Sequence, residues 1–193
     1  MAGHARFTAV LGACVLFPIA TADALLSLAA AGLYAAKWTT AIDAEWIAVG
    51  EGMRPELAGK LLARRDAMQA AVPDWEVDEG GWQALVASLA LPDPNTNHVL
   101  AAAIAGHADC IVTANLKDFP ERIISHFSVV ALHPDDFIIA QLDLDPYPAL
   151  GAFKGMRARK KNPPMSAEAF ADAMERNGLV GTAARLRDAA ALI

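Results

Sequence analysis

The stretch LPDPNTNHVLAAAIAGHADCIVTANLKDFP, residues 91–120, decides the fold class. A cluster of proline, aspartate and asparagine opens it, and the alanine-rich apolar run that follows ends at Gly106, as in a capped helix. Residues 110–113 form a short apolar run that is typical of a buried strand. A helix that leads into a strand of a parallel sheet begins near the carboxyl edge of that sheet, where open α/β sheets bind ligands. Asp93 and Asp118 can therefore meet at one site, although they are distant in sequence.

Strand-like and helix-like segments alternate along the rest of the chain. Residues 7–11 and 128–132 are apolar runs of strand length, and Pro18 separates the first of them from a helical pattern over residues 22–31. This alternation predicts an α/β sandwich with a parallel sheet. Further helices are expected after Thr39 or Thr40, over residues 56–71, between Gly81 and Leu89, over residues 133–142, and in the tail over residues 166–178 and 182–192.

The sequence Asp-Pro-Tyr-Pro at residues 145–148 predicts a domain boundary. We predict a main domain over residues 1–145, and over residues 146–193 a basic linker followed by a C-terminal helical extension. Residues 151–193 hold eight Lys and Arg against four Asp and Glu, whereas the rest of the chain holds eight against eighteen. An acidic body with a basic tail fits a nuclease whose tail contacts phosphates, and a solvated loop on an ordinary acidic protein is the alternative.

Composition limits the class of protein. The formal charge of −6 argues against a wholly basic nucleic-acid binder, and 55% apolar residues in a chain of 193 suffice for a substantial core. Cys14 and Cys110 are too few for a disulfide framework, so we expect buried thiols in a reducing cytoplasm. Residues 1–24 resemble a secretory signal, but we favour a first strand followed by a turn and a helix. Pro18 and Asp23 interrupt the only apolar segment that approaches membrane-spanning length, so no membrane partner is expected.

Four pieces of the sequence resemble the PIN-domain family, in particular the VapC-like toxin ribonucleases of toxin–antitoxin pairs. They are DPNTNHVLAAAIAGHAD and IVTANLKDFP in the central stretch, FTAVLGACVLFP near the start, and TTAIDAEW. The tail segment NPPMSAEAFADAMERNGL is similar to that of one VapC subgroup. The resemblance implies a PIN-like three-layer α/β/α sandwich with a central parallel sheet and a C-terminal helical extension. It also implies RNA and a cognate antitoxin as partners, with a homodimer as a further candidate.

The resemblance implies a four-carboxylate site that is half present in this chain. Glu45 and Asp118 match two of the acidic positions as catalytic and metal-binding residues. Gly12 and Thr96 stand where the family carries Asp, and Asp93 is a candidate replacement for the second gap or an ordinary turn residue. The implied cofactor is Mg²⁺ or Mn²⁺, which would offset the charge of clustered carboxylates and activate a bound water.

Other residues are expected to support this site or to bind RNA. Thr113 and Asn115 either hydrogen-bond near the metal or stabilise the chain, and Asp23 either serves the site or holds an arginine. His98 is expected to be a packed or capping residue rather than a ligand. The expected RNA-binding residues are Lys117, beside Asp118, and the densest cationic cluster of the tail, Arg157, Arg159, Lys160 and Lys161.

The sequence supports one leading function over two alternatives. The leading interpretation is a VapC-like metal-dependent endoribonuclease, the toxin of a pair, whose cleavage is impaired because Gly12 and Thr96 replace carboxylates. The alternative is a non-catalytic PIN-fold protein that binds RNA or a partner. A small-molecule-binding α/β protein is disfavoured, because no Gly-rich phosphate loop follows the first predicted strand. The sequence leaves open whether Gly12 marks a degenerate protein or a disabled variant.

Overall fold

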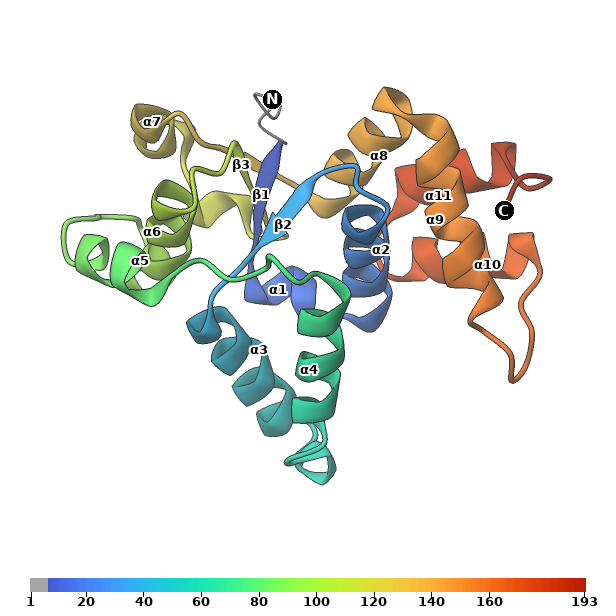
Figure 1. Cartoon of the computed structure of the whole chain (residues 1–193), viewed down its shortest axis with the longest axis horizontal. Coiled ribbons are helices and arrows are strands. Elements are labelled where there is room, and N and C mark those ends of the chain that lie inside the picture. The colour runs from blue at the N-terminus through green and yellow to red at the C-terminus, as the bar shows by residue number, and fades with distance from the viewer. Residues whose placement is uncertain (1–6) are drawn as a thin grey trace. The chain divides into compact units, whose positions relative to one another are not determined.

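The chain forms two compact units, which Figure 1 shows in a computed structural model that describes residues 7–193. The sheet unit comprises the described part of Met1–Phe17 together with Tyr34–Leu132, and the helical unit comprises Pro18–Leu33 together with His133–Ile193. Of residues 1–24, which resemble a secretory signal, residues 1–6 lie outside the described residues. Within residues 7–193, no helix combines the length and the apolar character needed to cross a membrane.

The sheet unit is built on four parallel strands in the order β2-β1-β3-β4. The α/β class predicted from the alternating pattern is therefore confirmed. The strand of residues 35–37 was not predicted, because Ala-Ala-Lys has no β-branched or aromatic residue. The strands are β1 Thr8–Leu11, β2 Ala35–Lys37, β3 Cys110–Val112 and β4 Val130–Leu132.

Burial stabilises the two central strands, β1 and β3. Ala9, Val10 and Leu11 of β1 are fully buried, as is the whole of β3. Near-continuous apolar runs of this kind are typical of parallel strands that are covered on both faces. In the register, Leu11 is paired with Val112, so the two central strands end side by side.

Helices and single turns connect the strands of the sheet unit. The expected helix over residues 56–71 is divided, because Gly59 adopts φ +72 in a turn and α4 begins only at Leu61. The expected Thr39 cap is confirmed, since its side chain accepts a hydrogen bond from Ile42 N at 3.2 Å. The elements are α1 Ala13–Leu16, α3 Thr40–Met53, η1 Pro55–Leu57, α4 Leu61–Ala71, α5 Glu79–Val86, η2 Pro94–Thr96, α6 Asn97–Ala105, η3 Leu116–Asp118, α7 Glu121–Ile124 and η4 Ser125–Phe127.

The helical unit contains α2 Ile19–Ala30, α8 Pro134–Leu144, α9 Pro146–Ala158, α10 Ala167–Arg176 and α11 Val180–Asp188. The helices α10 and α11 pack against each other, and α2 packs against both α8 and α9. Ser166 caps α10 as expected, its hydroxyl accepting a hydrogen bond from Ala169 N at 3.1 Å.

The α9 helix replaces most of the basic linker that the sequence suggested. Pro146 stands in its first turn, where the missing N–H of proline has no cost. Ala149, Phe153 and Met156 are buried at spacings of four and three residues, which is one face of a helix. The division between the two compact units falls between Leu132 and His133. The domain boundary after residue 145 stays a prediction.

Candidate functional site at the carboxyl edge of the sheet

The order of the strands creates a switch point between β1 and β3. The chain leaves β1 for β2 on one side and later adds β3 on the other side, so the connections diverge from this pair. Open α/β sheets bind their ligands at the carboxyl ends of strands where this happens. Gly12 directly follows β1 and Thr113 directly follows β3, and the Gly12 amide donates a hydrogen bond to the Val112 carbonyl at 3.1 Å.

Gly12 is not required by the backbone. Its φ of −73° and ψ of 160° are ordinary extended values that any residue can adopt. A Cβ built at this position would lie 3.6 Å from the Val112 carbonyl oxygen and 3.8 Å from Cys14 Sγ, which are ordinary van der Waals contacts. The switch point therefore has space for a side chain at Gly12, where the resemblance implies a carboxylate.

The turn after β3 is held by its own polar groups. The buried Thr113 hydroxyl accepts a hydrogen bond from Asn115 N at 3.0 Å and lies 3.3 Å from Cys14 Sγ. Ala114 N donates to the same sulfur at 3.4 Å. Thr113 thus ties the end of β3 to α1 and shapes the loop that leads to Asp118, which is the stabilising role that the sequence analysis left open for it.

Asp118 is half-buried at the end of the single turn η3. Its amide donates to the Asn115 carbonyl at 3.1 Å, and the buried Phe119 that follows anchors the turn. Lys117 precedes it with an exposed side chain. Asn115 therefore supports the turn through its backbone.

Glu45 lies on α3 and contacts a residue that sequence reasoning did not connect with it. Its Oε2 lies 3.3 Å from Nε2 of His98, on the first turn of α6, although the pair is not aligned as a hydrogen bond. The other ring nitrogen of His98 lies 2.7 Å from the Asn95 carbonyl oxygen, and the ring lies against Trp82 with 6.5 Å between ring centroids, so His98 is a packed residue and does not cap α6. The neighbouring Asp43 faces the interior instead, where it accepts hydrogen bonds from Trp46 at 2.9 Å and Gln69 at 2.8 Å.

The side chains of Asp93 and Thr96 both hydrogen-bond to the backbone of the turn that contains them. The Asp93 carboxylate accepts a hydrogen bond from Asn95 N at 2.9 Å, and the Thr96 hydroxyl donates to the Asp93 carbonyl at 2.8 Å. This geometry is that of an Asx turn at the start of a helix. The carboxylate of Asp93 thus has a local structural partner.

The acidic residues that the structure describes do not form a complete site for a divalent cation. In the part of the chain that the structure describes, no group of three or more His, Cys, Asp or Glu side chains is arranged to hold a metal ion. Magnesium and manganese prefer octahedral sets of oxygen ligands that include carboxylates. Gly12 and Thr96 leave two of the family's four carboxylate positions without such a ligand.

The family described as the VapC50 C-terminal domain matches residues 134–188. "Putative ribonuclease VapC50" of Mycobacterium tuberculosis is 42% identical over 77 residues, which are 40% of this chain and 46% of that protein. No solved structure matches. The resemblance to the VapC-like PIN family is confirmed.

The chain spans a little under half of the length of the relative that it matches. The matched VapC50 C-terminal segment begins with Pro134 of α8 and ends with Asp188 of α11. It therefore coincides with the helices that follow the sheet unit, and it starts next to the division between His133 and Leu132.

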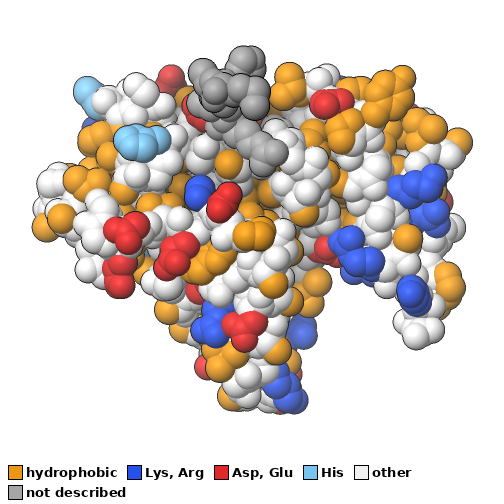
Figure 2. Space-filling model, viewed as in Figure 1, with side chains coloured by type: hydrophobic (Ala, Val, Ile, Leu, Met, Phe, Trp, Pro, Cys, Tyr) orange, Lys and Arg blue, Asp and Glu red, His pale blue; other side chains and the backbone are white. Residues whose placement is uncertain are grey.

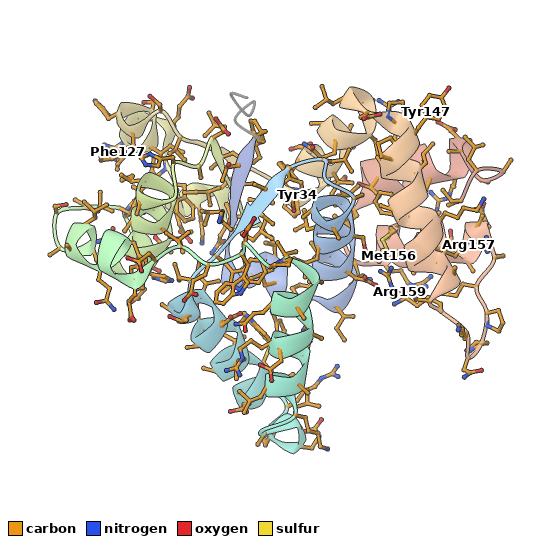
Figure 3. The ribbon with its side chains drawn as sticks, viewed as in Figure 1. Tyr34, Phe127, Tyr147, Met156, Arg157 and Arg159 are labelled. Carbon is orange, nitrogen blue, oxygen red and sulfur yellow. The ribbon has the colours of Figure 1, made fainter. Side chains whose placement is uncertain are left out.

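Asp23 meets two of the tail cations within the helical unit. The Asp23 carboxylate on α2 accepts hydrogen bonds from Arg159 at 2.5 Å and from Lys160 at 3.4 Å. Asp23 therefore holds an arginine, one of its two expected roles. Arg157 instead donates to the carbonyls of Met165 at 2.8 Å and Ile193 at 3.0 Å. Figure 3 shows Arg159 reaching from the end of α9 toward α2, with Arg157 on another side of α9.

The contrast between an acidic body and a basic tail changes when the compact units are considered. The helical unit holds all eight tail cations but nine acidic residues, because it includes Asp23 of α2 and the acidic residues of α8. Four of the eight tail cations, Arg157, Arg159, Lys160 and Lys161, cluster at the end of α9 and in the loop after it, where Figure 2 shows Lys and Arg side chains gathered.

The two cysteines differ in their surroundings. Burial, with a smaller contribution from the charge of Asp109, raises the pKa of the Cys110 thiol to about 12. Cys14 is exposed, so the expectation of two buried thiols is wrong for this residue. It lies in α1 at the switch point, where its sulfur contacts the Thr113 hydroxyl and the Ala114 amide.

Proposed function

We propose that this chain is the toxin-type component of a VapC-like pair, with RNA as its substrate class and a site too incomplete for efficient metal-dependent cleavage. The observation that carries the proposal is the position of Gly12. It lies at the β1–β3 switch point, with space for a Cβ, where the family carries a carboxylate. Glu45 and Asp118 retain the acidic residue types that the family uses.

The contacts of the remaining carboxylates support weak cleavage. Glu45 is placed against His98, and Asp93 is occupied by the turn that it caps. A hard cation binds more weakly when an oxygen ligand and its charge are removed. If Mg²⁺ or Mn²⁺ binds, it would supply charge for the phosphate and an activated water. Glu45 and Asp118 are the candidate holders, and the central position contributes no ligand.

The second candidate function is RNA or partner binding without cleavage. The absence of a metal-competent cluster in residues 7–193 favours it. The ribonuclease name of the relative favours the first candidate. A cognate antitoxin as partner and the cytoplasm as the place of action belong to both proposals.

Cleavage of a single-stranded RNA in the presence of Mn²⁺ tests the proposal. The natural chain should cut slowly or not at all, and Gly12→Asp should gain activity, which Thr96→Asp should raise further when combined with it. Gly12→Asn is the matched control, because it has nearly the same size as Gly12→Asp without the charge. Rapid cleavage by the unaltered chain would overturn the proposal, and the absence of a gain in either carboxylate variant would favour the binding-only function.

A further inference from the structure

The loop between α9 and α10 encloses a pocket lined by consecutive cations. The pocket measures about 510 Å³, and its lining residues are Arg159, Lys160, Lys161, Asn162, Pro163 and Met165. Lys161 and Pro164 pair through their backbones across the loop, which folds it back on itself. Three positive side chains and the side chain of Asn162 therefore surround one concave space in the helical unit.

Arg157 shapes this pocket without entering it. Its guanidinium donates to the Met165 carbonyl, at the far end of the loop, and to the Ile193 carbonyl at the end of the chain. These two bonds fix the loop against α9 and explain why only three of the four clustered cations line the pocket. The sequence could not make this distinction, because all four stand within five residues.

Asp23 is the anion that now neutralises part of the pocket. It binds Arg159 and Lys160, and Arg159 also donates to Ser27 Oγ at 2.9 Å. The Arg159 side chain is 55% exposed and that of Asp23 is 25% exposed, so the pair is not sealed from water. Exposed ion pairs of this kind are weak, and a single carboxylate leaves two of the three positive charges uncompensated.

We propose that the pocket is a phosphodiester site for RNA and that Asp23 is an internal anion which the RNA phosphate displaces. The guanidinium of Arg159 offers the planar pair of donors that suits phosphate oxygens, and the two lysines act as point charges. The inference rests on the proposed function for the choice of RNA as ligand. It adds a site built from residues of the helical unit and a role for Asp23 as a competitor that limits affinity.

The test is the binding of a fluorescein-labelled single-stranded RNA dodecamer to the full chain, measured by anisotropy in EDTA over a KCl series. Each phosphate contact on a single strand contributes about 0.7 to the slope of log affinity against log salt, so Arg159→Ala with Lys161→Ala should lower the slope by about 1.4. The matched control is Lys154→Ala with Arg176→Ala, two exposed cations of the same unit outside the pocket. It should leave the slope nearly unchanged.

Asp23→Asn gives the opposite sign. Removing the competing carboxylate should tighten RNA binding roughly two- to fivefold, the effect expected from releasing a weak exposed ion pair. Equal or weaker binding by Asp23→Asn would overturn the displacement, and an equal loss in the control pair would overturn the pocket.

A dodecamer of glutamate serves as the second ligand. If the peptide bound with the same pattern of variants and the RNA did not, the pocket would belong to an acidic protein partner, and the RNA assignment would fall. Because all binding is measured without divalent metal, these results are independent of the cleavage test on Gly12→Asp.

Discussion

Asp135 supports the helical unit through three hydrogen bonds, and its replacement by alanine should be strongly destabilising. Its carboxylate accepts hydrogen bonds from Gly181 N at 2.7 Å, Thr182 N at 2.8 Å and Thr182 Oγ1 at 2.7 Å. These bonds cap the start of α11 from α8. Thr182 is fully buried, so water cannot replace the lost acceptor for its two donors.

The size of the effect follows from those two donors. Each buried donor that is left without a partner costs about 1–3 kcal/mol, and the partly exposed Gly181 amide can recover water. We therefore expect Asp135→Ala to lower the free energy of unfolding by about 2–4 kcal/mol, within the upper range for the loss of a helix cap plus an unsatisfied hydroxyl. Asp136→Ala is the matched control, because Asp136 is the exposed neighbour on the same helix turn.

Urea denaturation followed by far-UV circular dichroism measures the loss, and tryptophan fluorescence separates the units. All four tryptophans belong to the sheet unit, so a loss confined to the helical unit should shift the dichroism transition first. A change below about 1 kcal/mol for Asp135→Ala, or an equal change for Asp136→Ala, would refute the reasoning from unsatisfied donors.

Two further predictions concern the thiols and the glycines of α3. A thiol reagent at pH 8 should label one cysteine per native chain, the exposed Cys14, and both in denaturant. Because burial raises the pKa of the Cys110 thiol from 9.0 to about 12, the folded state keeps a proton that the unfolded state loses. The free energy of unfolding should therefore fall by up to about 1.4 kcal/mol per pH unit between pH 9 and 12, a component that Cys110→Ala should lack. Gly52→Ala should stabilise the chain by about 0.5–1 kcal/mol, because no atom lies within 4 Å of its Cβ position. Gly50→Ala should not, since its Cβ would lie 2.6 Å from Leu61 Cδ1.

The strands that the sequence predicts are those with apolar, β-branched composition. β1, β3 and β4 follow from such runs, whereas β2 is held in place by its pairing with β1 and has no propensity of its own. The α9 helix was missed because its buried face has only three apolar residues among glycines and cations. Local sequence patterns predict the strands and helices whose own residues favour that structure, whereas tertiary packing determines the others.

The candidate site likewise combines positions that the sequence predicts with contacts that it does not predict. The positions of Gly12 and Thr113 at strand ends follow from the order of elements, and the parallel sheet places them side by side. The contact of Glu45 with His98 and that of Asp23 with Arg159 join residues that are 53 and 136 positions apart. No spacing rule could have paired them, because the pairing depends on how the helices pack.

Calorimetric titration of Mn²⁺ tests most directly whether Gly12 stands in the place of a metal ligand. The three proteins to compare are the unaltered chain, Gly12→Asp and Gly12→Asn. The unaltered chain and Gly12→Asn should bind Mn²⁺ weakly. Gly12→Asp should bind Mn²⁺ at least roughly tenfold more tightly, because the loss of even a residue that hydrogen-bonds a metal ligand typically lowers metal affinity by that factor. Equal Mn²⁺ affinity in all three proteins would show that Gly12 does not occupy the position of a missing metal ligand and would contradict the proposal of an incomplete metal site.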